Sequence, residues 1–126
     1  MTNATDKPLL ILIAGPYRSG TGDDPAHMAA NLRHLETAAW PIFAKGHLPM
    51  IGEWVALPVL ESAGADVFSP LAGEVMYPTA ERLLQHCDAV LRLPGESTGA
   101  DNDVRIARER GIPVYTSIDE VPARSV

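Results

Sequence analysis

Residues 8–15 read PLLILIAG, and this stretch decides the fold class. The run is apolar almost throughout, contains two β-branched isoleucines and ends in glycine. Strands that are covered on both faces of a parallel sheet have such continuous apolar runs, whereas half-exposed strands alternate apolar and polar residues. The stretch therefore predicts a central, fully buried strand of an α/β protein, and a helix should follow it.

The first predicted helix covers residues 25–45, where apolar side chains recur at three- and four-residue steps. Pro41 lacks an amide hydrogen, so we expect it to kink this helix or to start a new turn. Gly46 is a plausible C-terminal cap. The next strand is predicted at residues 47–52, and Pro49 favours a position at the edge of the sheet.

The rest of the chain continues the alternation of helices and strands. Residues 53–73 are rich in proline and glycine, and we predict a broken helix followed by a loop there. A helix at 74–86, a strand at 88–94, a loop and helix at 95–111 and a closing strand at 112–117 follow. This order predicts a three-layer, doubly wound (Rossmann/flavodoxin-like) parallel sheet of about four to five strands.

The bulk composition narrows the possible partners. The 126 residues are expected to form a single domain, 1–126, with residues 1–7 as a disordered tail. A net charge of -6 argues against a nucleic acid polymer as partner, because such binding needs clustered Lys and Arg. Cys87 is the only cysteine and the four histidines lack paired ligand spacing, so we expect no metal and no cofactor. Without a signal-like N-terminus or a long apolar stretch, we expect a cytoplasmic protein with no membrane partner.

The loop after the first strand, GPYRSGTG at residues 15–22, has glycines at the spacing of a nucleotide triphosphate loop. That motif needs a lysine where this chain has Thr21, and two aspartates follow the loop directly. Triphosphate binding is therefore not expected. Backbone amides, the ring of Tyr17 and the cation of Arg18 suit a sugar or a single phosphate better.

Ligands of doubly wound proteins bind beyond the carboxyl ends of the strands, which places residues 15–20, 52–54 and 94–103 on one rim. Asp103 follows Ala100 by three residues and so borders the helix face that should pack on the sheet. The nearby helix N-terminus is expected to keep Asp103 ionised. A solvated first-turn acid is an equally good reading of Asp103 from spacing alone.

Several other residues are candidates either for the site or for a structural role. Asp101 matches the acid of a cap-x-x-acid helix start. Tyr17 is either a loop anchor or a lid over a sugar, and Glu53 is either a rim charge or a second carboxylate of the same cleft. Trp54 is either a core residue or a stacking platform. Asp88 lies at the opposite rim of a parallel sheet, so we interpret it as structural.

Three segments resemble a known family: IAGPYRSG at residues 13–20, LLQHCDAVLRLPGESTGADNDVRIARERGIPVY at 83–115 and, more weakly, GEWV at 52–55. Together they are similar to the nucleoside 2-deoxyribosyltransferase-like superfamily, which includes deoxynucleoside 5′-monophosphate N-glycosidases. The resemblance implies a doubly wound fold in which a helix-borne carboxylate attacks the anomeric carbon while the base departs. Water or a second base then resolves the ribosyl-enzyme.

The resemblance also implies roles for individual residues. Asp103 stands where the family usually carries its nucleophilic glutamate, and Tyr17 matches the ring that contacts this carboxylate or the sugar. Glu53 is not matched to a family position and completes the predicted catalytic set from its place on the rim. The predicted binding residues for a nucleoside or nucleoside 5′-monophosphate are Gly15, Pro16, Arg18, Ser19, Gly20, Trp54, Ser97, Gly99 and Asn102. A homodimer or larger homo-oligomer is also implied.

Two positions depart from the family pattern. Asp103 is one methylene shorter than glutamate, and Ala80 stands where the family usually carries an acid on the preceding helix. These departures favour an alternative function, a noncatalytic nucleotide-binding module that has lost its catalytic acid pair.

Overall fold

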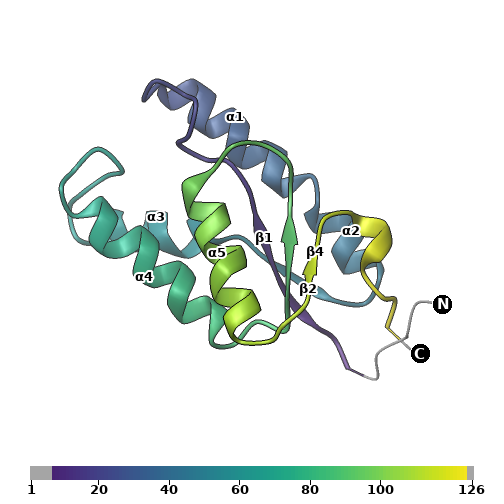
Figure 1. The fold of residues 1–126 in the computed structure, drawn as a ribbon. Helices are drawn as coiled ribbons and strands as arrows, with labels where there is room; N and C mark the ends of the chain where they lie inside the picture. Colours follow the sequence, from purple (N-terminus) through teal and green to yellow (C-terminus); the bar gives the residue numbers. More distant parts are fainter. Residues whose placement is uncertain (1–6, 125–126) are drawn as a thin grey trace.

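The computed structural model describes residues 7–124. The tail predicted at residues 1–7 lies, apart from Lys7, outside the described residues. Figure 1 shows a central sheet with helices on both of its faces. In chain order the elements are β1 (Leu10–Ala14), α1 (Pro25–Glu36), α2 (Ala39–Ala44), β2 (Leu48–Met50), α3 (Gly52–Ser62), α4 (Ala72–Leu84), β3 (Ala89–Arg92), α5 (Thr98–Glu109), β4 (Val114–Tyr115) and the short 3₁₀ helix η1 (Ile118–Glu120).

The sheet has four strands in the order β2-β1-β3-β4, and every neighbouring pair is parallel. This confirms the α/β fold class with a Rossmann/flavodoxin-like sheet. From β1 the chain first moves outward to β2 and then crosses back to β3, so the order of strands reverses between β1 and β3. Pro49 pairs with Ile11 from the edge strand, as predicted.

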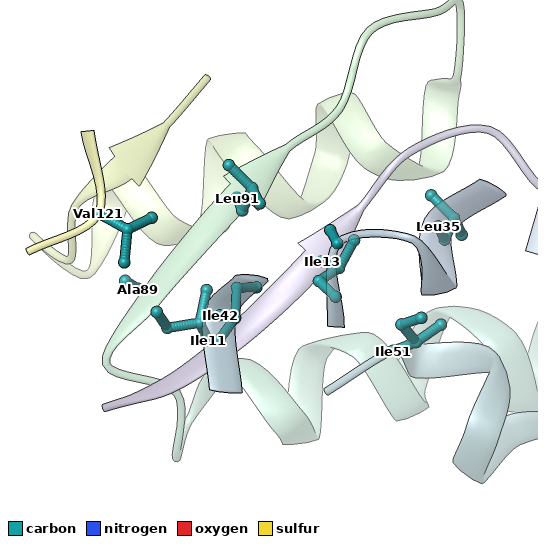
Figure 2. Packing of buried hydrophobic residues seen from close by; sticks show 9 residues of the cluster. Ile11, Ile13, Leu35, Ile42, Ile51, Ala89, Leu91 and Val121 are labelled. Carbon is teal, nitrogen blue, oxygen red and sulfur yellow. The ribbon is translucent and has the colours of Figure 1, made fainter. Parts of the chain in front are cut away.

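The side chains of β1 alternate between two hydrophobic cores. Ile11 and Ile13 face α1, α2 and the segment after η1, where they pack with buried side chains such as Leu35, Ile42 and Val121 (Figure 2). Leu12 and Ala14 face the opposite layer, formed by α4 and α5, which lie side by side in Figure 1. Because both faces of β1 are covered, its sequence is continuously apolar.

The amino ends of β1 and β3 are tied together by Asp88. Its Oδ2 accepts a hydrogen bond from the Leu10 amide at 2.9 Å, and its own amide donates to the Leu10 carbonyl at 2.8 Å. This confirms the structural interpretation of Asp88, at the end of the sheet away from the predicted ligand rim.

The helix predicted over residues 25–45 divides into two, as the expected new turn at Pro41 allowed, but the predicted position of the break is wrong, because the two helices are separated at Thr37 and Ala38. The second helix begins two residues before Pro41, which places the proline in its first turn. Amides of a first turn have no intrahelical acceptor, so Pro41 costs no hydrogen bond there. Gly46 follows α2 with a φ of 94°, which confirms it as the C-terminal cap.

The broken helix predicted within residues 53–73 is also wrong. Helix α3 continues through Pro58 to Ser62, and the loop begins only afterwards. Pro58 is exposed, so water can satisfy the carbonyl one turn earlier that loses its amide partner. Exposure therefore lets the proline stay inside the helix.

Replacing Ile42 tests the core between α2 and the sheet. Ile42 is fully buried, so we expect Ile42→Ala to lower the free energy of unfolding by about 2–5 kcal/mol. Phe43 is the matched control, since it is the next residue of α2 but is 58% exposed in the single chain, and Phe43→Ala should cost less than about 1 kcal/mol at a protein concentration too low for self-association. Urea unfolding measures both, and equal losses would contradict the assigned orientation of α2.

Candidate functional site

A cavity of about 230 Å³ lies where β1 ends, at the point where the strand order reverses. Its walls come from the loop after β1, the first turns of α3, the inner face of α4 and the beginning of α5. Doubly wound proteins bind their ligands at this place. The volume is slightly below the roughly 300–1,000 Å³ that is usual for small-molecule pockets, which indicates a compact ligand.

Glu53 enters the cavity from the first turn of α3. The helix begins directly after β2, and Ile51 at its N-cap offers no capping side chain. The Glu53 carboxylate instead accepts a hydrogen bond from its own backbone amide. Burial raises the pKa of Glu53 above its ordinary value, and this hydrogen bond only partly opposes the rise.

Tyr17 reaches the same cavity from the loop after β1. Burial raises the pKa of its phenol, and the nearby carboxylate of Glu53 raises it further. Tyr17 is therefore a neutral hydroxyl at physiological pH. It can donate a hydrogen bond to a carboxylate or to a ligand oxygen.

Asp103 faces the cavity from α5. The helix begins at Thr98 because the Ser97 hydroxyl accepts a hydrogen bond from the Ala100 amide at 3.1 Å. Ala100 and Ala107, on either side of Asp103 along the helix, are both buried against the sheet. The carboxylate thus lies on the border of the packed face, as the spacing predicted, and the reading as a solvated acid is wrong.

The expectation that the helix terminus keeps Asp103 ionised is also wrong. Burial, and after it the charge of Glu53, raise the pKa of Asp103 to about 7, although Arg92 acts in the opposite direction. Asp103 is the sixth residue of α5, and the stabilising effect of a helix N-terminus fades after the first turn. Burial beside a second carboxylate therefore outweighs the helix N-terminus in setting the pKa of Asp103.

Arg92 at the end of β3 was not predicted to act at the site; it lies outside the cavity lining, but its charge acts on Asp103. Its guanidinium donates to the carbonyls of Leu93 and Gly95 and to Asp101 Oδ1, the last two at 2.9 Å. Asp101 is thus an ion-pair partner and not the acid of a capping box, and the cap residue is Ser97. The sequence did offer a signal for Arg92. An arginine at the end of a buried apolar strand is expected at the same rim as the loop after β1.

The structure brings most of the predicted site residues together. Those that line the cavity are Gly15, Tyr17, Arg18, Ser19, Glu53, Ser97, Gly99 and Asp103. Gly15 also has a packing role, since a Cβ there would come within 2.7 Å of Leu35 Cδ2.

Four predicted binding residues, Pro16, Gly20, Trp54 and Asn102, lie outside the cavity lining. Pro16 packs against Gly95, where a Cβ would come within 2.6 Å of Pro16 Cγ. Trp54 donates from Nε1 to Glu36 Oε2 at 2.9 Å. Asn102 accepts from Arg105 on the same helix at 2.7 Å. The indole N–H of Trp54 and the side-chain carbonyl of Asn102 thus bind other groups of the protein.

The wall formed by α4 was not predicted. Met76, Tyr77 and Ala80 line the cavity at steps of three and four residues, together with Ala72 one turn earlier. This spacing is that of one helix face. Ala80 therefore does face the cavity, and it presents a methyl group where the family resemblance implies an acid.

Comparison of the chain with protein-family models, curated proteins and solved structures finds no match. Within residues 7–124, no group of three or more His, Cys, Asp or Glu side chains could hold a metal ion. No helix in this part of the chain is long and apolar enough to cross a membrane.

The half-buried carboxylate of Asp103 should make stability depend on pH. Its folded pKa of about 7 exceeds the unfolded value of 3.8, so the native state binds the extra proton and stability falls as pH rises through this window. We expect Asp103→Asn to match wild type near pH 4 and to exceed it by on the order of 2–4 kcal/mol at pH 8.

Urea unfolding at several pH values measures this difference. Glu109→Gln is the control, because Glu109 lies exposed at the end of the same helix, and it should follow the wild-type pH dependence. A difference between Asp103→Asn and wild type that does not grow with pH would contradict the buried position of the carboxylate.

Proposed function

We propose that the protein cleaves the N-glycosidic bond of a nucleoside or nucleoside 5′-monophosphate and passes the glycosyl group to water or to a second base. One observation carries the proposal: Glu53 and Asp103, which are 50 residues apart in the chain, line the same half-enclosed cavity, closely enough for the charge of Glu53 to raise the pKa of Asp103. Paired carboxylates of this kind are the machinery of glycoside cleavage through an oxocarbenium-like transition state.

The two carboxylates are expected to titrate as a pair, because like charges in one cavity repel and the charge of Glu53 raises the pKa of Asp103. Near neutral pH the pair can hold one proton. The pKa of about 7 places this proton mainly on Asp103; the reaction uses the other form, with the proton on Glu53 and the charge on Asp103, whose ionised state Arg92 favours. This form offers one nucleophile and one acid in the same cavity.

In the first step, an Asp103 oxygen forms a bond to the anomeric carbon as the carbon–nitrogen bond breaks. The base leaves with the electron pair of that bond and takes the proton of Glu53. In the second step, Glu53 accepts a proton from water or from a second base, which attacks the anomeric carbon and releases Asp103. The scheme uses no metal and no organic cofactor.

The remaining cavity residues support this chemistry by position and polarity. The neutral hydroxyl of Tyr17 lies within electrostatic reach of Glu53 and can hold the sugar or orient the carboxylate. Met76 and Ala80 give α4 an apolar wall against which a base can lie. An apolar wall also keeps water away from charges that develop in the transition state.

The second candidate is a noncatalytic nucleotide-binding module. Ala80 favours it, because a methyl group lies in the cavity wall where the family resemblance implies an acid. This candidate keeps the same cavity and ligand class and differs from the first only in turnover.

Release of free base, followed by chromatography, distinguishes the two candidates. Wild type is incubated with a panel of nucleosides and their 5′-monophosphates, beside Asp103→Asn and Glu53→Gln. We expect turnover by wild type and a loss of about 10²–10⁴-fold in kcat for each variant, because each removes a proton-transfer or bond-forming group.

Glu74→Gln is the control, since Glu74 lies on α4 outside the cavity lining, and it should retain wild-type rates. Failure of wild type to release any base, together with a rise in melting temperature on adding a monophosphate, would favour the binding module.

We further propose that the protein acts in the cytoplasm as a homodimer or larger homo-oligomer. Trp40 and Phe43 support self-association, because they are 70% and 58% exposed and their rings stack at 6.2 Å on α2. Light scattering should give at least twice the mass of one 13.5 kDa chain. A monomeric mass at micromolar concentration would overturn the assembly.

A further inference from the structure

Arg18 is the one cationic side chain among the described residues that line the cavity, and its guanidinium is already occupied. Its Nε donates to Asp23 Oδ1 at 2.7 Å, and its Nη1 donates to the Val67 carbonyl, also at 2.7 Å. The Cζ atom of Arg18 lies over the Phe68 ring, 5.3 Å from its centre. Two donor groups and one face of Arg18 are therefore engaged within the protein.

The backbone of the loop holds Asp23 in place for this contact. Asp23 has a φ of 61°, a left-handed conformation that no other non-glycine residue in the described part of the chain adopts. The Thr21 hydroxyl is buried, accepts a hydrogen bond from the Asp23 amide at 3.2 Å and donates to the Arg18 carbonyl at 2.6 Å. The loop thus adopts an uncommon conformation that presents the Asp23 carboxylate to Arg18.

The other charged groups of the cavity are both acids. Glu53 and Asp103 line it from α3 and α5, and Arg92 is occupied by Asp101 and by two carbonyls. A phosphate dianion at this site would face carboxylates and a cation that is already paired. An uncharged hydroxyl would meet no such repulsion.

We propose that Asp23 is a specificity-determining residue: by pairing with Arg18 it biases the site toward nucleosides with a free 5′-hydroxyl and against their 5′-monophosphates. The inference rests on the proposed glycosidase function and narrows its substrate class. Arg18 then serves mainly to join the loop after β1 to the turn at residues 66–69, through Val67 and Phe68.

The test compares Asp23→Asn with Asp24→Asn. Asparagine tolerates the left-handed conformation and keeps the size of the side chain, so Asp23→Asn removes the charge that faces Arg18. Asp24 is the adjacent acid, and its Oδ1 accepts a hydrogen bond from the Ala26 amide at 3.1 Å as the cap of α1. Asparagine caps helices equally well, so Asp24→Asn removes the same charge without touching Arg18.

The measurement is kcat and KM for a deoxynucleoside and for its 5′-monophosphate. Wild type and Asp24→Asn should prefer the nucleoside. Asp23→Asn should improve kcat/KM for the monophosphate by about fivefold, the factor that one exposed ion pair can supply, through a lower KM. Its constants for the nucleoside should not change.

The outcomes separate the two proposals. Preference of wild type for the monophosphate, or equal behaviour of the two variants, would overturn the role of Asp23 and leave the glycosidase function intact. If no variant turns over either substrate, the glycosidase function fails. Calorimetry then measures how tightly the three proteins bind the same monophosphate. The role of Asp23 requires that Asp23→Asn binds it more tightly than wild type and that Asp24→Asn does not. Asp23→Gly, which accepts a φ of 61° freely, repeats the comparison if Asp23→Asn does not fold.

Discussion

The parallel pairing of β1 with both β2 and β3 is the constraint on which the rest of the structure depends. Because the three strands run in one direction, the segments that follow them emerge at the same edge of the sheet. Tyr17, Glu53 and Arg92 reach this edge directly after or at the ends of β1, β2 and β3. Asp103 follows from the helix after β3. The cavity therefore results from the topology, and each strand supplies part of its chemistry.

The cavity combines features that oppose folding stability. Two carboxylates share a small space with apolar side chains from α4, and burial makes their ionisation unfavourable. A protein selected only for stability would place neutral groups at such positions. Asp23 adds an uncommon backbone conformation at the rim. These costs are grouped around one cavity, which is the distribution expected of a functional site.

Much of the fold could be predicted from the sequence, because its signals are local. The continuous apolar runs of β1 and β3 identified buried strands, and Gly46 correctly marked the end of α2. The break at Thr37 and the continuity of α3 through Pro58 could not be predicted, since packing and solvent exposure decide them. A proline in a first turn or on an exposed face costs little, and sequence alone does not show which face it occupies.

The site was predictable only in part for a similar reason. The spacing of Asp103 relative to Ala100 and Ala107 correctly placed it beside the packed face of α5. Its raised pKa depends on burial by the folded chain and on Glu53, which lies far away in the sequence, so no local pattern reports it. Trp54 was expected near the ligand, but its indole instead donates to Glu36 on α1. Long-range contacts of this kind decide which rim residues reach the cavity.

The central claim is that Asp103 and Glu53 occupy one cavity and titrate as a coupled pair. Carbon-13 NMR titration of the Asp103 carboxyl group in wild type and in Glu53→Gln tests it most directly. We expect a wild-type midpoint near the pKa of about 7 and a clearly lower midpoint in the variant, because the neighbouring charge is then removed. An ordinary midpoint near 4 in both proteins would contradict the shared cavity and the mechanism built on it.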